Sequence, residues 1–191
     1  MNYLAHLFLS AGETELMVGN FIADGVKGSN YKNYPEKVSR GIIMHRSTDF
    51  YSDTHPVYLR SVHNLASEHG KFSGIIADML YDYLLATHWK DFSNEGLDKF
   101  CKKTYVVLRS FQDSMPEKCQ VTLNYMIKYN WLESYKTLEG IERALKGLSG
   151  RMKYYYPMHN SIKPIRNDIE VFQKDFYEFF PLLIEHVKQF R

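Results

Sequence analysis

Apolar side chains recur with the period of an α-helix through almost the whole of this 191-residue chain, and strand-like alternation is sustained nowhere. The clearest stripe keeps the i, i+3, i+4, i+7 spacing of one buried helix face: Phe72, Ile75, Ile76, Met79, Leu80, Tyr83 and Leu84. The pattern predicts helices at residues 2–10, 13–27, 35–52, 56–69, 72–90, 94–114, 117–135, 138–150 and 167–190. The predicted fold class is therefore all-α, a compact helical bundle with short connections.

No repeat, low-complexity tract or Gly/Ser-rich linker interrupts the chain, so we expect one helical domain over residues 1–191. Hydrophobic residues make up 45% of the sequence and charged residues 24%, so a chain of this length can bury a core without disulfides. The segment 152–167 contains Pro157 and Pro164, which predicts irregular structure or short helical pieces.

The composition also argues against several classes of protein. Cys101 and Cys119 are too few for a disulfide framework, and reduced cysteines are typical of a cytoplasmic protein. No run of about 18 apolar residues and no basic leader occurs, so neither a membrane span nor a signal peptide is predicted. A formal net charge of +2 is too small to indicate a nucleic-acid partner.

Pairs of polar residues lie four positions apart on apolar helix faces, and residues at i and i+4 share one side of a helix. The pairs are Asn20 with Asp24, His45 with Asp49, and Asp78 with Asp82. We expect these side chains to point inward. A buried carboxylate is costly unless it has a partner or a metal ion. Such repeated pairs therefore indicate a shared site.

Carboxylates and imidazoles are good ligands for divalent cations, and helix bundles direct such groups inward to build metal sites. The predicted metal ligands are Asp24, His45, Asp49, Asp78 and His6, with Asn20 as a supporting group. For any one of these residues, a hydrogen-bonded core group or a structural ion pair is the plainer alternative. Their joint occurrence favours the metal. No phosphate-binding glycine loop, G-x-S-x-G or H-E-x-x-H motif offers another chemistry.

Several blocks of the sequence resemble the acyl carrier protein phosphodiesterase family. The blocks are MNYLAHL at the N-terminus, GNFIADGVKG at 19–28, GIIMHRSTD at 41–49, DMLYDYLLATHW at 78–89, NWLESY at 130–135 and GIERALKGLSGR at 140–151. Each block alone is weak, but in combination they are specific and cover most of the chain to about residue 151. The resemblance is poorest in residues 29–40 and 153–170.

The resemblance implies an HD-phosphohydrolase-like helical fold and a metal-dependent reaction. That reaction is hydrolysis of the phosphodiester joining 4′-phosphopantetheine to a serine of holo acyl carrier protein, which gives apo carrier protein and 4′-phosphopantetheine. The resemblance also implies Mn²⁺ as cofactor, with Mg²⁺, Fe²⁺ or Co²⁺ as related ions, and Asp24 as the position most expected to be essential. The sequence has no adjacent His-Asp dipeptide, so we expect His45 and Asp49 to replace that element.

This reaction suggests roles for other polar residues near the blocks. Asp82 would orient a ligand or accept a proton from water, and His88 would protonate the departing serine oxygen. Arg46 would hold a phosphate oxygen, with a salt bridge as the alternative.

The predicted substrate contacts are Lys27, Arg40 and Arg151. A loosely basic stretch at 27–40 could steer an acidic carrier protein, although a solvated helix face is the plainer interpretation. The tyrosines at 154–156 could line a channel for the pantetheine arm.

Two rival functions stay open from sequence. A phosphohydrolase of the same fold could act on a nucleotide or another small phosphoester. A non-catalytic module could bind carrier protein and use the polar pairs as structural networks. A carboxylate-bridged oxidase is disfavoured because the central helices lack the Glu-x-x-His motif.

Overall fold

The computed structural model describes all residues from Met1 to Arg191, and it confirms the all-α class. The α-helices are α1 (Tyr3–Leu9), α2 (Thr14–Ile22), α3 (Glu36–Thr54), α4 (Pro56–His69), α5 (Ser73–Thr87), α6 (Trp89–Phe92), α7 (Leu97–Ser110), α8 (Glu117–Lys128), α9 (Trp131–Ser134), α10 (Leu138–Gly150), α11 (Ile162–Asn167) and α12 (Ile169–Val187). Short 3₁₀ turns fill several connections, among them Ala23–Gly25 and Gly28–Asn33.

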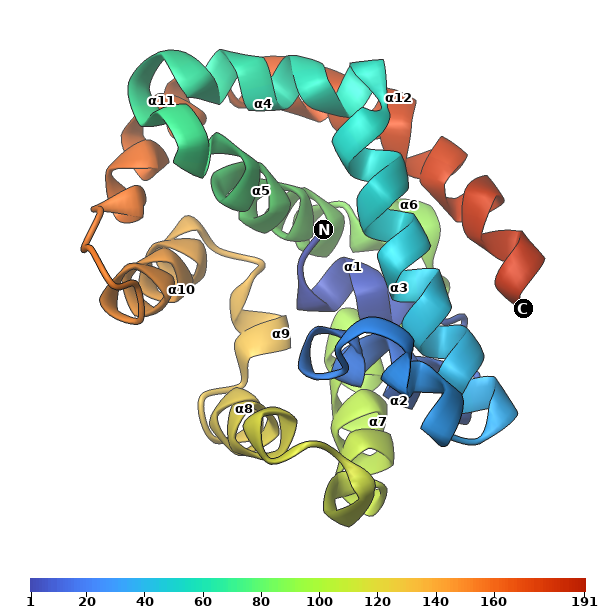
Figure 1. Ribbon diagram of the computed structural model, residues 1–191. Coiled ribbons are helices and arrows are strands. Elements are labelled where there is room, and N and C mark those ends of the chain that lie inside the picture. Colours follow the sequence, from blue (N-terminus) through green and yellow to red (C-terminus); the bar gives the residue numbers. More distant parts are fainter.

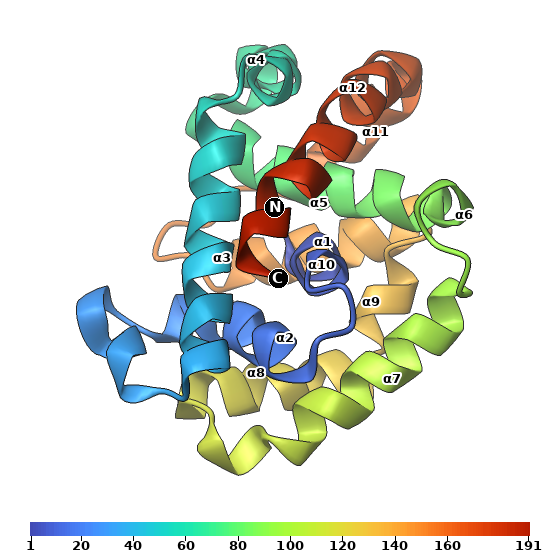
Figure 2. The ribbon, with the colours of Figure 1, turned by 90° about the vertical axis from the view of Figure 1, so that its right-hand side faces the viewer.

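The short helix α1 lies in the middle of the molecule. Longer helices surround it, with α3 on one side, α5 above and α2 below in the view of Figure 2. Helix α12 returns along α4 and α3, while α7, α8, α9 and α10 form the opposite side of the bundle (Figure 1). The buried apolar side chains join into one core of 45 residues. Removing this apolar surface from water is the main stabilising contribution.

Helices α2 and α3 approach so closely that only glycine fits at the crossing. A Cβ atom on Gly19 would lie 2.0 Å from the carbonyl oxygen of Val38, and one on Gly41 would lie 2.2 Å from that of Leu16. Real Cβ atoms do not approach backbone oxygens so closely, because such a contact is a hard-sphere clash. The two glycines therefore set the distance between the helices that carry Asn20 and His45.

The beginning of α1 is held by a side chain from a distant helix. The backbone N–H groups of Leu4 and Ala5 donate to the two carboxylate oxygens of Asp82, at 2.8 and 3.0 Å. The first N–H groups of a helix have no partner within the helix, so they need an acceptor of this kind. Asp82 on α5 thereby fixes where α1 starts and how it is oriented.

Some predicted helices end earlier than the apolar pattern suggests. The helix predicted at 13–27 ends at Ile22 and continues only as a 3₁₀ turn, Ala23–Gly25. The helix predicted at 117–135 is divided into α8 and α9, because Asn130 adopts the left-handed conformation with φ of +46°. As expected, residues 158–167 form short helical pieces. No helix combines the length and the apolar composition needed to cross a membrane.

Candidate metal centre

His6, His45 and Asp49 meet between α1 and α3, and one potential ligand atom from each lies within 4.8 Å of the others. The Asp49 carboxylate accepts from His6 Nε2 at 3.1 Å and from His45 Nε2 at 3.2 Å. The two imidazole rings stack with centroids 3.8 Å apart. His6 and His45 are buried, while the Asp49 side chain is 38% exposed. Two imidazoles and a carboxylate that converge in this way form a possible metal-binding triad.

Asn20 on α2 holds both histidine-bearing helices. Its side-chain oxygen accepts from His45 Nδ1 at 3.0 Å, and its amide nitrogen donates to the backbone oxygen of His6 at 2.7 Å. With Nδ1 bound to Asn20, the other ring nitrogen of His45 is directed toward the carboxylates. A partner that fixes one imidazole nitrogen and frees the other is the usual arrangement behind a metal ligand.

Asp24 adjoins the triad from its outer side. One of its carboxylate oxygens lies 3.4 Å from His45 Nε2, but its side chain is 72% exposed. We expected the face shared by Asn20 and Asp24 to point inward, and this is wrong for Asp24. The reason is that α2 ends at Ile22, so Asp24 lies on a 3₁₀ turn rather than one helical turn below Asn20.

The charges of the cluster depend on each other. Burial would lower the pKa of His45, but hydrogen bonds with Asp24 and Asp49 outweigh it and raise that pKa to about 9. Burial, together with the neighbouring His45, lowers the pKa of His6 to about 4. Burial opposes ionisation of Asp49, yet the hydrogen bonds from both histidines hold its pKa well below the usual range. The hydrogen bond from His45 likewise lowers the pKa of Asp24. Near neutral pH the cluster therefore combines a protonated His45, a neutral His6 and ionised Asp24 and Asp49 side chains.

Asp78 does not enter the triad, although it lies next to it. Its carboxylate accepts from the α-amino group of Met1 at 2.7 Å and from the Tyr58 hydroxyl at 2.5 Å. The same amino group is 3.5 Å from Asp49. Asp78 is therefore linked to the cluster through a buried ammonium group, and its carboxylate is already occupied.

The geometry gives Asp82 and Arg46 structural positions instead of the predicted catalytic ones. Asp82 is fully buried and each of its oxygens accepts a backbone hydrogen bond from the start of α1, so it is not open to solvent. The Arg46 guanidinium donates to the backbone oxygens of Val26 and Gly28, at 2.6 and 2.7 Å. It thereby ties the connection after α2 to α3, and its terminal nitrogens are engaged there rather than directed at a phosphate.

His88 is separated from the cluster by its partners. It caps the far end of α5, bonds Gln173 of α12, and lies 3.8 Å from Asp91. These contacts do not support His88 as the proton donor. Its position follows from the length of α5, since Thr87 is the last residue of that helix.

The predicted substrate contacts are scattered. Lys27 is exposed on the connection before Gly28, and Arg40 is half-buried on α3 with its Nε unpartnered. Arg151 lies elsewhere, at the end of α10, where it lines a pocket of about 370 Å³. The structure therefore does not bring Lys27, Arg40 and Arg151 into one surface.

That pocket contains residues that the sequence-based prediction did not identify. Its aromatic lining includes Tyr3, Trp131 and Tyr135, and Arg143 joins Arg151 from the same helix. One signal was available in the sequence: residues at 143, 147 and 151 are spaced by four, which places them on one face of α10. The aromatic residues come from α1 and from residues 129–135 in and around α9, so only the folded chain brings them together.

An all-α fold that gathers two histidines and a carboxylate from facing helices defines a class of helical proteins with a candidate divalent-metal centre. Comparison with known proteins makes this class specific. A family model described as acyl carrier protein phosphodiesterase matches residues 1–183, and the chain belongs to this family.

Curated relatives agree over nearly their whole length. The acyl carrier protein phosphodiesterase of Photorhabdus laumondii subsp. laumondii is 30% identical over 97% of this chain and 94% of the relative. Those of Yersinia pestis and Enterobacter sp. (strain 638) are 29% and 27% identical, each over 98% of both chains. No solved structure matches this chain.

Proposed function

We propose that this protein hydrolyses the phosphodiester between 4′-phosphopantetheine and the serine of holo acyl carrier protein. The products are apo carrier protein and 4′-phosphopantetheine. The observation that carries the proposal is the His6, His45 and Asp49 triad, in a chain that matches the phosphodiesterase family over residues 1–183. A buried cluster of this composition suits a reaction in which negative charge develops on phosphate oxygens.

The donor set fits a divalent metal ion, and we assign His6, His45 and Asp49 as its ligands, with Asp24 beside them. Mn²⁺ is the proposed ion, and Mg²⁺, Fe²⁺ and Co²⁺ are chemically related alternatives. When bound, such an ion supplies a water of lowered pKa and neutralises charge on the phosphodiester.

The residues of the chain have separate tasks around this centre. Asn20 keeps His45 in the orientation that directs Nε2 toward the carboxylates. Asp24 is the most exposed carboxylate of the group, so it is the one that meets incoming substrate and can accept a proton at its free oxygen. Asp78 and the Met1 amino group hold Asp49 from behind.

The direct test is incubation of the protein with holo acyl carrier protein and Mn²⁺, followed by intact-mass analysis of the carrier protein. We expect the wild type to remove the mass of the phosphopantetheine arm and Asp24→Ala to leave it in place. Asp98→Ala, which alters an exposed carboxylate on α7, is the matched control and should behave as wild type.

Two other results would redirect the assignment. Bound metal and hydrolysis of small phosphodiesters without loss of the arm would favour a small-molecule phosphohydrolase. Tight binding of carrier protein with neither metal nor hydrolysis would favour a binding module. The proposal places the reaction in the cytoplasm, with which the two unpaired cysteines are compatible.

A further inference from the structure

The pocket of about 370 Å³ opens between the beginning of α1, α9 and α10. In Figure 1 these elements face one another on the side of the molecule where α8 and α10 lie. Its aromatic and aliphatic lining includes Trp131, Tyr135 and Leu148, and Asn2 and Ser134 add polar groups. Concave, mostly apolar sites with a few polar groups are the usual form of a ligand pocket.

The pocket adjoins the metal centre through α1. Asn2 and Tyr3 line the pocket, and His6 follows Tyr3 by three residues on the same short helix. Residues three or four apart on a helix are about 5–6 Å from each other at Cβ. The Tyr3 ring packs against Phe21 at 5.8 Å and Trp131 at 6.5 Å, so it bridges the α2 side of the cluster and the pocket wall.

The charges of the lining restrict what can bind. Arg143 and Arg151 both line the pocket and no carboxylate does; the Nε of Arg151 donates only to the backbone oxygen of Gly147, at 3.1 Å. A cationic group would thus be repelled. A neutral chain attached to an anionic group is favoured, because the chain can pack on the rings while the anion stays near the arginines and the metal centre.

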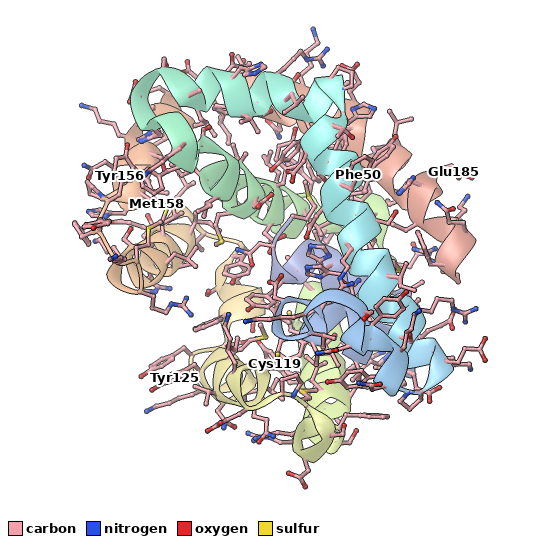
Figure 3. The ribbon with its side chains drawn as sticks, viewed as in Figure 1. Phe50, Cys119, Tyr125, Tyr156, Met158 and Glu185 are labelled. Carbon is pink, nitrogen blue, oxygen red and sulfur yellow. The ribbon has the colours of Figure 1, made fainter.

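The tyrosine triplet predicted to line the arm channel lies elsewhere. Tyr154 and Tyr155 are 77% and 64% exposed, and the Tyr156 hydroxyl bonds His69 at 3.0 Å while its ring stacks on Phe72. Figure 3 shows Tyr156 near α11, whereas Tyr125 extends outward from α8. The tyrosines that line the pocket are instead Tyr3, Tyr129 and Tyr135.

We propose that this pocket binds the uncharged pantetheine portion of the substrate while the phosphodiester lies at the metal centre. The inference rests on the proposed function and adds to it a binding site on α1, α9 and α10. In this arrangement Trp131 and Tyr3 pack against the arm. Arg143 and Arg151, which line the same pocket and are both exposed, attract the acidic carrier protein.

Gly147 offers a way to fill the pocket without disturbing the fold. It lines the pocket within α10, and a Cβ atom there would meet no heavy atom within 4 Å. Leucine is also a better helix former than glycine. Gly150→Leu is the matched control, because Gly150 is in the same helix and equally open but does not line the pocket.

The measurement is the ratio of kcat/KM for holo acyl carrier protein to kcat/KM for bis(4-nitrophenyl) phosphate, both with Mn²⁺. The small diester has no arm to place in the pocket. For Gly147→Leu we expect this ratio to fall about tenfold or more, the scale on which misfit in an apolar pocket separates substrates. Most of the change should be in KM for carrier protein. Gly150→Leu should keep the wild-type ratio.

A second filling variant, Ala144→Leu, guards against an effect peculiar to one position, since Ala144 lines the pocket one turn earlier. Wild-type ratios in both Gly147→Leu and Ala144→Leu would overturn the pocket assignment and leave the proposed function standing. Failure of the wild type to release the arm at all would overturn both. A lower ratio in the two pocket variants alone would support the site.

Discussion

The two ring nitrogens of His45 have different partners: Nδ1 is bound to Asn20, and Nε2 faces the carboxylates of Asp24 and Asp49. Asn20 therefore fixes the orientation of the His45 ring. Asn20 binds His45 Nδ1 and the backbone of His6 together. Its own side chain is fully buried, so it has no solvent to replace either contact. A residue of this kind acts on the metal centre without touching the reacting atoms.

We predict that Asn20→Ala weakens Mn²⁺ binding by about 10–100-fold, the usual effect of removing a partner that orients a metal ligand. Isothermal titration with Mn²⁺ measures it directly. Asn94→Ala, at an exposed asparagine, is the control and should bind as wild type. Equal Mn²⁺ affinity of the Asn20 variant and wild type would show that the ring of His45 is held by other contacts.

Asp82 should give the fold a distinctive dependence on pH. Burial raises its pKa from 3.8 to about 7, against the opposing effects of the two backbone hydrogen bonds and the Met1 ammonium group. The folded protein therefore retains a proton that the unfolded chain releases above pH 3.8. The contribution of Asp82 to the free energy of unfolding must fall as pH rises across this window and become constant above it.

The variant Asp82→Asn cannot titrate at this position. We expect the difference in free energy of unfolding, wild type minus variant, to decrease from pH 4 to about pH 7 and then to level off. Urea unfolding at several pH values measures it. Parallel curves for the two proteins would mean that the Asp82 carboxyl has the same pKa in the folded and unfolded states.

At the scale of elements, the sequence predicts which polar side chains converge when both residues of a pair lie within one helix. His45 and Asp49 lie within the long helix α3, and their side chains do converge. Asn20 and Asp24 span the end of α2, which the apolar pattern does not mark. Asp82 lies on α5 as predicted, but its partner is the start of α1, and a contact across 78 residues cannot be read from local spacing.

The close contact between α2 and α3 should determine how Asn20 and His45 are placed in the candidate metal centre. Gly41→Ala should push the helices apart and lower the free energy of unfolding by about 1–3 kcal/mol, as overpacking does. Because Asn20 and His45 are on the separated helices, Mn²⁺ binding should weaken as well. Urea unfolding and metal titration check both effects.

Gly74→Ala is the matched control for that substitution. A Cβ atom at Gly74 meets nothing within 4 Å, so the change should stabilise the protein by about 0.5–1 kcal/mol through helix propensity alone. If Gly41→Ala were as stable as wild type with unchanged Mn²⁺ affinity, the helices would have room to adjust, and the glycine crossing would not set the geometry of the centre.

At the scale of the whole molecule, the two cysteines report on the integrity of the core. Both are buried and unpaired, and burial raises the pKa of Cys101 to about 12 and that of Cys119 above its usual value. Cys119 packs against the end of α2, its Sγ lying 3.8 Å from the backbone oxygen of Ile22. A thiol reacts as the thiolate, so both should be inert in the folded state.

We therefore predict that 5,5′-dithiobis(2-nitrobenzoic acid) labels neither cysteine in the native protein and both cysteines in urea. The absorbance of the thiolate that the reagent releases measures the labelling. The Cys101→Ser and Cys119→Ser variants assign any signal to one position. Rapid labelling of Cys119 alone under native conditions would indicate that α8 opens away from α2 without global unfolding.

Helix α1 has only seven residues, and helices shorter than about 12–15 residues are marginal by themselves in water. During synthesis it leaves the ribosome well before the chain reaches Asp82, which is 78 residues beyond Leu4. Until α5 has been made, the backbone N–H groups of Leu4 and Ala5 lack the Asp82 carboxylate that fixes the start of α1. The candidate metal centre, to which α1 contributes His6, consequently reaches its final geometry only after α5 has been made.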